Sequence, residues 1–241
     1  MNTEIRAFCI TINGHAESEK GYETLKNSTS VFNIEKFNAI VPETVNETLL
    51  KEDLRWSYPW YEKDYCAVTN LYKPIYRTAN REQKIACSLS HYLLIKQSIK
   101  DNVPILILEH DAVFTKEMNK SVLDDILSQK QFNYIGINNP DRATRNAALF
   151  HNEVMKGYRT NHLLIEVPWI DNNKKIPQGL AGNSAYIVTP DGAKDYLEMI
   201  NKTGLWINDA FLCKQIFKDK VGVTTTYYTK IQKGLTSTTT L

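Results

Sequence analysis

Two carboxylates and a histidine directly follow a short apolar stretch in the middle of the chain. Ile105–Leu108 is aliphatic, which predicts a strand buried on both faces, and Glu109, His110 and Asp111 come immediately after it. Glu109 and Asp111 are two residues apart, so a strand would place them on one face, where they can converge on one cation or polar ligand. Carboxylate oxygens suit Mg²⁺ or Mn²⁺ better than a soft metal. The alternative is a strand end whose charges are simply solvated.

The rest of the chain supplies the elements that would position this cluster. Strand patterns alternate with helical ones, which indicates an α/β fold with an open sheet flanked by helices, in a single domain over residues 1–241. Ligands bind outside the carboxyl ends of the strands in such a sheet, which is where the acidic cluster would lie. We expect strands at Ala7–Ile12, Val31–Ile40, Ile105–Leu108, Phe132–Ile137, Ala185–Val188 and Val221–Tyr228, and helices at His15–Lys26, Arg81–Lys100, Met118–Lys130, Pro190–Ile200 and Asp209–Lys218.

Two asparagines stand where helix caps are expected. Asn80 precedes the longest helical pattern and Gln83 follows three residues later, which is the spacing of a capping box. Asn208 can cap the helix predicted from Asp209 onward, which would place Asp209 at a helix N-terminus.

Two further segments lack a regular pattern. Residues 139–177 contain three prolines and several asparagines and are expected to be irregular. Residues 51–80 look like an insertion, a long loop or small subdomain. The stretch from Arg55 to Lys84 carries six basic and three acidic residues and seven Trp or Tyr side chains. This composition suits the stacking of bases or sugars beside anionic groups.

The composition excludes several classes of protein. A hydrophobic content of 42% with 23% charged residues is that of a soluble globular protein, and a net charge of +2 does not by itself indicate nucleic-acid binding. Four scattered cysteines show no zinc spacing, so we expect buried free thiols and a reducing compartment. Neither a signal-peptide pattern nor an apolar run of membrane-spanning length is visible, so a cytoplasmic location without a transmembrane segment is expected.

Read together, four segments resemble glycosyltransferase family 25, the lipooligosaccharide-biosynthesis type. These segments are Ile85–His91, Leu108–Phe114, Gly182–Val188 with Gly192–Ala193, and Ile207–Leu212. They are similar, in order, to the family's helix motif ending in Ser-His, its Leu-Glu-Asp-Asp-x-x-Phe metal segment, its Gly-x-x-x-Tyr strand and its x-x-Asp-x-x-Leu motif. The chain departs from the family at Lys84 (family Glu), Ala86 (family Gly) and His110 (family Asp), and the aromatic stretch at 55–77 has no recognised counterpart.

The resemblance implies a GT-A-like fold and sugar transfer, with inversion, from a nucleotide sugar, expected to be a UDP-sugar, by a hexosyl- or pentosyltransferase. A divalent ion, Mn²⁺ or Mg²⁺, would offset the charge that grows on the leaving diphosphate. Asp111 is the expected direct ligand, and Glu109 would contact the donor ribose or a metal-bound water. His110 is either a further ligand or a packed residue.

Asp209 is the candidate general base, because a hydroxyl acceptor must lose a proton as it attacks. A helix N-terminus would keep its carboxylate ionised. The alternative is that Asp209 only supports the start of its own helix.

Other polar residues are candidates for donor binding. Arg81 and Lys84 could meet the donor phosphates or remain solvated charges. Gly182 and Ser184 would let backbone and hydroxyl approach a sugar. Gln232 and Ser237, in the closing segment, could cover the donor or belong to a frayed terminus. His91 is expected to be a hydrogen-bonded structural histidine.

The acceptor remains open between two classes, and both would use the aromatic and basic stretch. Trp60, Tyr65 and Arg77 are its candidate acceptor-binding residues. The family resemblance favours a saccharide acceptor, whereas the basic and aromatic composition also suits a hydroxymethylated DNA base, as a phage enzyme would require. A third interpretation is a non-catalytic sugar- or nucleotide-binding domain that has lost its metal. No obligate protein partner is indicated.

Overall fold

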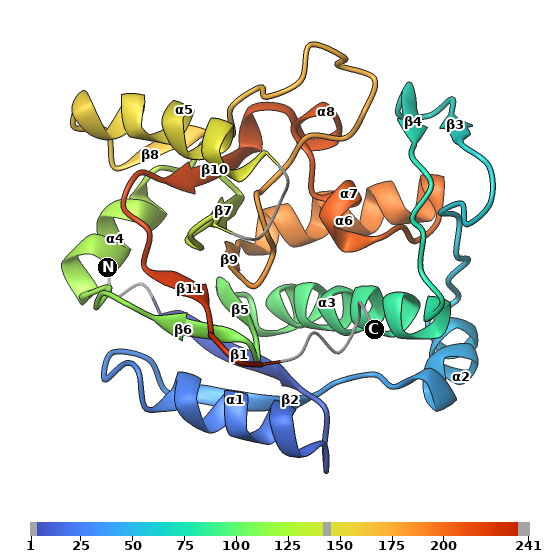
Figure 1. The fold of residues 1–241 in the computed structure, drawn as a ribbon, viewed down its shortest axis with the longest axis horizontal. Coiled ribbons are helices and arrows are strands. Elements are labelled where there is room, and N and C mark those ends of the chain that lie inside the picture. Colours follow the sequence, from blue (N-terminus) through green and yellow to red (C-terminus); the bar gives the residue numbers. More distant parts are fainter. Residues whose placement is uncertain (1–3, 142–145, 236–241) are drawn as a thin grey trace.

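A seven-stranded mixed sheet forms the centre of the molecule in the computed structural model, which describes residues 4–141 and 146–235 (Figure 1). Its strand order is β2-β1-β5-β9-β7-β10-β8; β2, β1 and β5 are parallel to one another, and β9 runs antiparallel to both of its neighbours, β5 and β7. The strands are β1 (Arg6–Thr11), β2 (Ile34–Asn38), β5 (Ile105–Glu109), β7 (Tyr134–Gly136), β8 (Leu164–Glu166), β9 (Ala185–Val188) and β10 (Val221–Thr224). The expected α/β fold, a GT-A-like open sheet flanked by helices in a single domain, is confirmed.

Helices cover both faces of this sheet. They are α1 (Ala16–Lys26), α2 (Val45–Lys51), α3 (Arg81–Asp101), α4 (Lys120–Ser128), α5 (Ala147–Arg159), α6 (Pro190–Thr203), α7 (Asn208–Phe211) and α8 (Lys214–Phe217), with short 3₁₀ turns at Pro42–Thr44 and Lys218–Lys220. Within the described residues, none of the helices is both long and apolar enough to cross a membrane.

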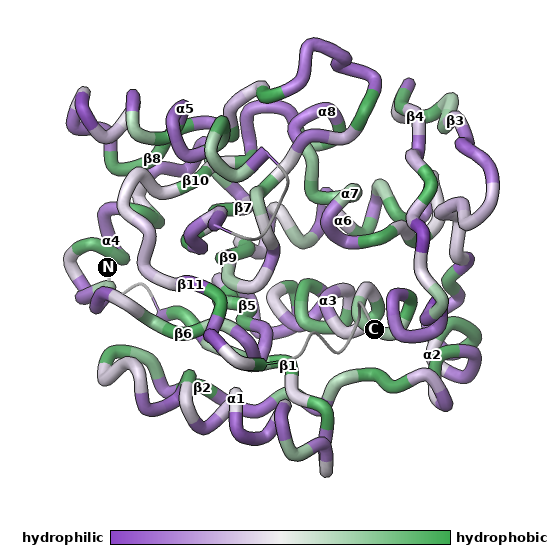
Figure 2. The backbone as a smooth tube through the Cα atoms, in the orientation of Figure 1, coloured by the Kyte–Doolittle hydropathy of each residue, from purple (hydrophilic) through white to green (hydrophobic). Residues whose placement is uncertain are grey.

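Side chains that alternate along the strands enter two separate cores. Ile105 and Ile107 of β5 pack towards α3 and α6, whereas Leu106 and Leu108 pack towards α1 and α4. All four are fully buried, as the sequence predicts for a strand covered on both faces. Apolar and polar residues alternate along the covering helices (Figure 2). The central helix α3 is buried nearly all round, since residues 88–92 are all buried.

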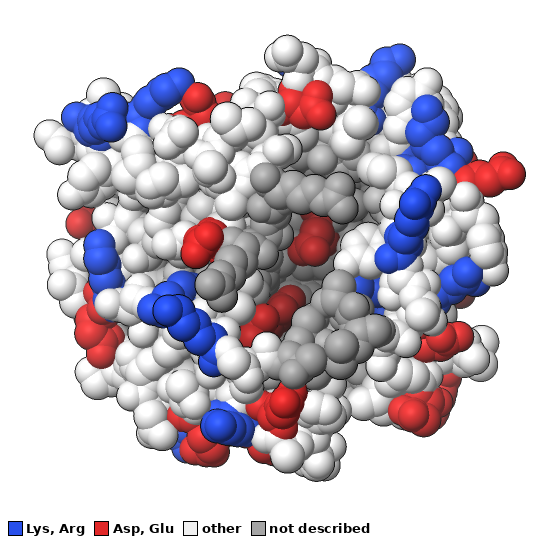
Figure 3. Space-filling model, in the orientation of Figure 1, with Lys and Arg blue, Asp and Glu red and all other residues white. Residues whose placement is uncertain are grey.

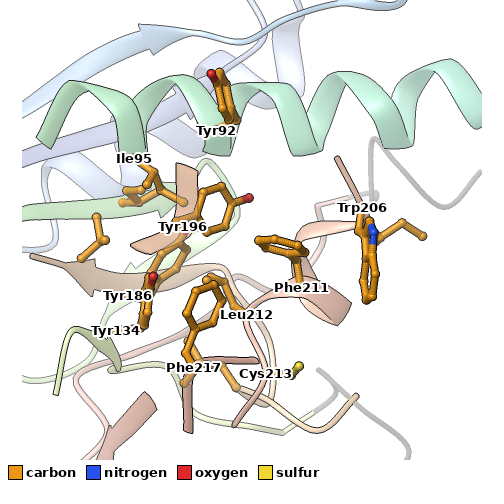
Figure 4. Close-up of a cluster of buried hydrophobic side chains, with 14 of the residues drawn as sticks. Tyr92, Ile95, Tyr134, Tyr186, Tyr196, Trp206, Phe211, Leu212, Cys213 and Phe217 are labelled. Carbon is orange, nitrogen blue, oxygen red and sulfur yellow. The ribbon is translucent and has the colours of Figure 1, made fainter. Parts of the chain in front are cut away.

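An aromatic cluster fills the core next to α3 (Figure 4). Tyr196 of α6 meets Phe211 of α7 edge to face, with 5.0 Å between ring centroids, and Tyr134 of β7 packs on Phe217 of α8 at 4.6 Å. Edge and offset ring contacts of this kind are favourable beyond the area that they bury. The cluster therefore fixes α7, the helix of Asp209, against α6 and the sheet.

Two short antiparallel ribbons complete the fold. One pairs β6 (Ala112–Phe114) with β11 (Thr229–Ile231), and so fixes the segment that follows Glu109. The other is the hairpin of β3 (Asp64–Cys66) and β4 (Leu71–Lys73), inside the predicted insertion.

The N-terminus of α3 differs from the sequence prediction. Asn80 occupies the N-cap position, but its side chain accepts no hydrogen bond there, and the Gln83 carbonyl oxygen is buried without a partner among the described residues. The predicted capping box is therefore wrong.

The single helix predicted over Asp209–Lys218 is also wrong, because it is divided into α7 and α8. Cys213 between them is extended and pairs with Gly179, where a Cβ atom would lie 2.0 Å from the Leu212 oxygen. Ile207, and not Asn208, holds the N-cap position, because the Asn208 amide turns inward and accepts from the Tyr196 hydroxyl at 3.2 Å.

Segment 139–177 is only partly irregular, because α5 and β8 lie within it. The predicted strand over Val221–Tyr228 likewise ends early: β10 stops at Thr224, and the chain then enters the separate strand β11.

Candidate active site

The candidate site lies at the carboxyl end of β5, the last of the three parallel strands β2, β1 and β5. The backbone pairing of β5 with β9 extends one residue further, because the Glu109 amide donates to the Ser184 oxygen at 2.8 Å. Glu109 is the last residue of β5, and Ser184 comes immediately before β9. The two segments that were predicted to carry donor-binding residues are therefore adjacent.

Glu109 is held by a histidine of α3. His91 Nε2 lies 3.1 Å from Glu109 Oε1, and His91 Nδ1 lies 3.0 Å from the Tyr186 hydroxyl of β9. Burial pushes the pKa of Glu109 up, but His91, His110 and Lys84 outweigh it, so that its pKa lies below the ordinary value. His91 is fully buried and hydrogen-bonded through both nitrogens.

The pKa of Asp111 shifts in the opposite direction, upward. Burial, followed by the charge of Glu109, raises its pKa to about 7, while a hydrogen bond with Ser184 opposes the shift. Its Oδ1 atom is buried and has no hydrogen-bond partner among the described residues. A carboxylate oxygen left unpaired at such a site suits a cation that brings its own positive charge.

His110 lies between them with its side chain buried, and burial lowers its pKa. Its backbone oxygen accepts from the Gln232 side chain at 3.0 Å and approaches α1 so closely that a Cβ atom at Gly21 would lie 2.4 Å away. Glycine at position 21 therefore lets α1 pack against the loop that carries the carboxylates.

A cavity of about 390 Å³ opens beside these groups. One wall is apolar and comes from the ends of β1 and β2, with Ile10, Ile12, Ile40 and Val41. The opposite wall carries His91, Glu109, His110 and Asp111, together with Cys87 and Ser90 of α3. Figure 3 shows a hollow in the middle of this face of the molecule with acidic side chains deep inside it. The position outside the carboxyl ends of parallel strands is the one that the sequence predicts.

Asp209 stands next to this wall, on α7. Its side chain is exposed to solvent. Desolvation by the neighbouring protein and the charge of Glu109 raise its pKa, although Lys84 and His91 oppose them. The expectation that a helix N-terminus keeps this carboxylate ionised is not met, because the pKa of Asp209 is raised and α7 is only four residues long. A carboxyl with a raised pKa is a better proton acceptor when it is deprotonated.

The two basic residues at the start of α3 have separate environments. Lys84 is buried with its ammonium 4.8 Å from the Tyr76 ring centre; burial would lower its pKa, but Tyr76, Cys87 and Asp209 raise it. Arg81 lies over the Tyr61 ring at 4.2 Å and donates to the Tyr61 hydroxyl at 2.6 Å. Neither side chain is simply solvated.

The segment before β9 contains one residue that the sequence reasoning missed. Gly182 has a φ of +86°, which favours glycine, and Ser184 is buried against Asp111. Between them, Asn183 is buried with both polar atoms of its amide unpartnered among the described residues. An Asn beside a glycine is an ordinary turn signal in sequence, so only the burial reveals it as a candidate.

Gln232 holds the site together from the far end of the chain. Its side-chain amide donates to the oxygens of Gly21, His110 and Ala112 at 2.8–3.0 Å, and its backbone amide donates to the Asp111 oxygen at 2.7 Å. The structure thus places its amide group on backbone oxygens of the acidic loop. Ser237, the other predicted residue of this segment, lies outside the described residues.

The predicted acceptor residues lie along the aromatic segment. Trp60 stacks on Trp56 with 5.3 Å between ring centroids, and Tyr65 and Arg77 are exposed. Residues 55–57 pair with Leu205, in the short connection between α6 and α7, through Leu205 N to Arg55 O at 2.8 Å and Ser57 N to Leu205 O at 2.9 Å. The tryptophan pair is therefore attached beside the helix that carries Asp209.

The geometry brings together the parts of a group-transfer site. A cavity with one apolar wall can hold a ring system, and the hard oxygens of Asp111 and Glu109 fit a divalent ion such as Mg²⁺ or Mn²⁺. Asp209 can accept a proton from a hydroxyl that enters from the side of Trp60.

The comparison with protein families agrees with this arrangement. The model of glycosyltransferase family 25 (LPS biosynthesis protein) matches residues 19–212, which include α3, the acidic segment, β9 and α7. No curated protein matches the chain. Because the match spans most of the sequence and the sheet is that of a GT-A-like fold, the chain belongs to glycosyltransferase family 25, the LPS-biosynthesis glycosyltransferases.

Proposed function

We propose that this glycosyltransferase is metal-dependent and inverting, and that it moves a sugar from a nucleotide sugar to a hydroxyl group of a saccharide. The observation that carries the proposal is the cavity at the ends of β1, β2 and β5, with an unpaired Asp111 oxygen on its polar wall and a second carboxyl, Asp209, close to Glu109. A non-catalytic binding domain would have no need for a proton acceptor next to that wall.

The two walls of the cavity suit the two parts of a nucleotide-sugar donor. The apolar wall of Ile10, Ile12 and Val41 suits the base, and polar groups on the opposite wall suit the ribose and the phosphates. Glu109 is fixed by His91 in its ionised form and can accept hydrogen bonds from ribose hydroxyls or from a metal-bound water.

A divalent ion would be held by Asp111, with Glu109 next to it. When bound, Mn²⁺ or Mg²⁺ offsets the charge that develops on the leaving nucleotide diphosphate. Asp111 suits the role of ligand for two reasons. One of its oxygens has no hydrogen-bond partner among the described residues, and burial disfavours its carboxylate unless a cation lies beside it.

The acceptor hydroxyl would approach from the side of Trp60, and Asp209 would take its proton as the oxygen attacks the anomeric carbon. One carboxylate that deprotonates the acceptor, opposite the leaving nucleotide, is the requirement of single displacement with inversion.

The basic side chains of the aromatic segment favour a saccharide over DNA as acceptor. The Lys73 ammonium is buried, donates to the Ser57 oxygen at 2.6 Å and forms an ion pair with Asp64, and Lys84 is buried beside Tyr76. Two of the six cations counted from the sequence are thus unavailable to phosphates, while exposed aromatic rings remain for sugar faces.

Mass spectrometry of acceptors tests the proposal. The protein is incubated with a panel of nucleotide sugars and with either lipooligosaccharide core fragments or hydroxymethylated DNA, with Mn²⁺ or with a chelator. We expect a mass increase of one hexose or pentose on the saccharide, in Mn²⁺ only. Full transfer in the chelator would refute metal dependence, glycosylated DNA would refute the acceptor class, and a product that retains the anomeric configuration would refute inversion.

A further inference from the structure

A thiol, an imidazole and a carboxylate meet on the polar wall of the cavity. Cys87 and His91 are four residues apart on α3 and so lie on one face of the helix, and that face meets Glu109 at the end of β5. One ligand atom from each of the three residues lies within 4.8 Å of the others. We propose that Cys87, His91 and Glu109 form a binding site for a thiophilic divalent cation, Zn²⁺ in the first place.

The donor set favours this class of metal. Sulfur, nitrogen and carboxylate oxygen are the three kinds of ligand that Zn²⁺ takes in proteins, whereas Mg²⁺ prefers oxygen alone. His91 Nε2 and Glu109 Oε1 are 3.1 Å apart, close to the separation of about 3.3 Å that two bonds of about 2 Å make at a tetrahedral angle. Cys87 lines the cavity, so a fourth position would face the cavity and hold water.

The surroundings of His91 match those of a metal-bound histidine. A histidine that binds a metal through one nitrogen donates the N–H of the other to a fixed acceptor, which sets its tautomer. The Tyr186 hydroxyl, fully buried on β9, lies 3.0 Å from His91 Nδ1 and can accept that hydrogen bond. On binding, the thiol proton of Cys87 would pass to solvent and the single imidazole proton of His91 would reside on Nδ1, which leaves Sγ, Nε2 and the Glu109 carboxylate with free electron pairs.

Cys87 differs from the three other cysteines of the chain. Cys9, Cys66 and Cys213 are buried, whereas Cys87 is partly accessible and borders the cavity. The site also differs from the one proposed for Mn²⁺ or Mg²⁺, which uses Asp111, although both share Glu109. If the proposed function holds, a cation at Cys87 would draw Glu109 away from the donor and inhibit transfer.

Cobalt spectroscopy tests the site in the absence of any nucleotide sugar, so the result does not depend on the proposed transferase reaction. Co²⁺ replaces Zn²⁺ and gives a thiolate-to-metal charge-transfer band in the near ultraviolet when sulfur is a ligand. We expect the reduced wild-type protein to show this band at one Co²⁺ per chain, and Zn²⁺ to abolish it.

Variants assign the ligands. Cys87→Ser should lose the band, and Cys66→Ser, the matched control with a buried thiol elsewhere, should keep it. In competition with a chromophoric chelator, Tyr186→Phe should weaken Zn²⁺ binding about 10–100-fold, the usual cost of losing an outer-shell partner, and Cys87→Ser should weaken it further. Absence of the band in the wild type, or its persistence in Cys87→Ser, would overturn the proposal.

Discussion

The donor cavity and the aromatic segment use charge in different ways. In the cavity, carboxylates at the ends of regular elements are desolvated, and their pKa values move in opposite directions, below the ordinary value for Glu109 and up to about 7 for Asp111. In the aromatic segment, cations lie over rings, such as Lys63 over Tyr72 at 4.5 Å. Charges removed from water interact strongly with one another, because little solvent screens them. An exposed contact between a cation and a ring stabilises the fold by only about 0.5–1 kcal/mol.

The supports of the two regions also differ. The cavity is bounded by strands in the central sheet and by the long helix α3. The aromatic segment instead depends on a hairpin of two three-residue strands and on backbone contacts to loops, from Ser57 N to Leu205 O at 2.9 Å and from Tyr72 N to Lys175 O at 2.8 Å. We therefore expect substitutions in the cavity to affect the chemistry strongly and substitutions in the aromatic segment to affect acceptor use moderately.

Asp111→Asn is expected to have the largest effect. Asn resembles the protonated carboxyl that burial already favours, so the melting temperature without metal should not fall, but the ligand charge is lost. Turnover should drop at least about 10³-fold, which is the upper end of the range seen when one electrostatic contact to the transition state is lost. Kinetics with Mn²⁺ and melting curves with and without it measure both effects. Wild-type turnover, or an unchanged rise of the melting temperature on adding Mn²⁺, would contradict the assignment.

Asp209→Asn should follow, with a fall in kcat of about 10²–10⁴-fold and little change in donor affinity. Asn keeps the size of the side chain, so a purely structural role would show as a lower melting temperature with kcat nearly normal.

The pH profile sharpens this assignment. A base must be deprotonated to act, and burial with the charge of Glu109 raises the pKa of Asp209. The acidic limb of kcat in the wild type should therefore lie at higher pH than the ordinary carboxyl range, with activity lost as pH falls. A limb at or below the ordinary carboxyl range would remove Asp209 from the base role.

Trp60→Ala and Arg77→Ala test the aromatic segment. Loss of one stacking platform should raise the acceptor KM about 10-fold, since ring contacts contribute about 0.5–1.5 kcal/mol, while nucleotide affinity measured by calorimetry should not change. Tyr158→Ala, which removes an exposed ring on α5, is the matched control and should leave the acceptor KM unchanged. An equal loss of donor affinity in Trp60→Ala would place Trp60 at the donor.

Asp64→Asn should have the smallest effect, on stability alone. It removes the ion pair with the buried ammonium of Lys73, and because Asp64 itself is 53% exposed, we expect a loss of about 0.5–1 kcal/mol. Asp191→Asn, which breaks the exposed pair with Lys194, should cost less.

The sign of the pH dependence gives a second check on Asp64. Lys73 holds the pKa of Asp64 below its ordinary value, so the stabilisation is complete above the ordinary carboxyl range and is lost as pH falls through the lowered pKa. Urea unfolding should therefore show a difference between wild type and Asp64→Asn at neutral pH that disappears in acid. A constant difference would show that the pair is not its cause.

Local patterns predicted the central strands well, because their signals are contained in a few neighbouring residues. Ile105–Leu108 and Ala185–Val188 are continuous apolar runs, and both form strands buried on two faces. By contrast, α5 was missed, because prolines and asparagines surround a weak helical repeat in which Phe150, Val154 and Gly157 face the core. Gly157 carries no apolar signal, yet it allows close packing, since a Cβ atom there would lie 2.5 Å from the Ile165 side chain and force it to move.

The pairs that define the site depend on packing between distant elements. The acidic segment and α7 can each be identified from sequence, but the contact of His91 with Glu109 requires α3 to pack on β5, and no spacing within α3 predicts its partner. Likewise, the direction of the Asp209 pKa shift depends on how much protein surrounds a short helix, which periodicity does not report.

The hydrogen bonds of Gln232 have a consequence for the order of folding. The side chain of Gln232 bridges α1 and the acidic loop, across 211 residues to Gly21 and 122 residues to His110. Contacts between positions so far apart in sequence form late, because closing the long loop between them costs entropy before the contact stabilises it. During synthesis, β1, α1 and β5 leave the ribosome long before Gln232 does. The nascent chain can therefore assemble these strands early, but it acquires a fully braced Glu109–Asp111 loop only after β11 has joined β6.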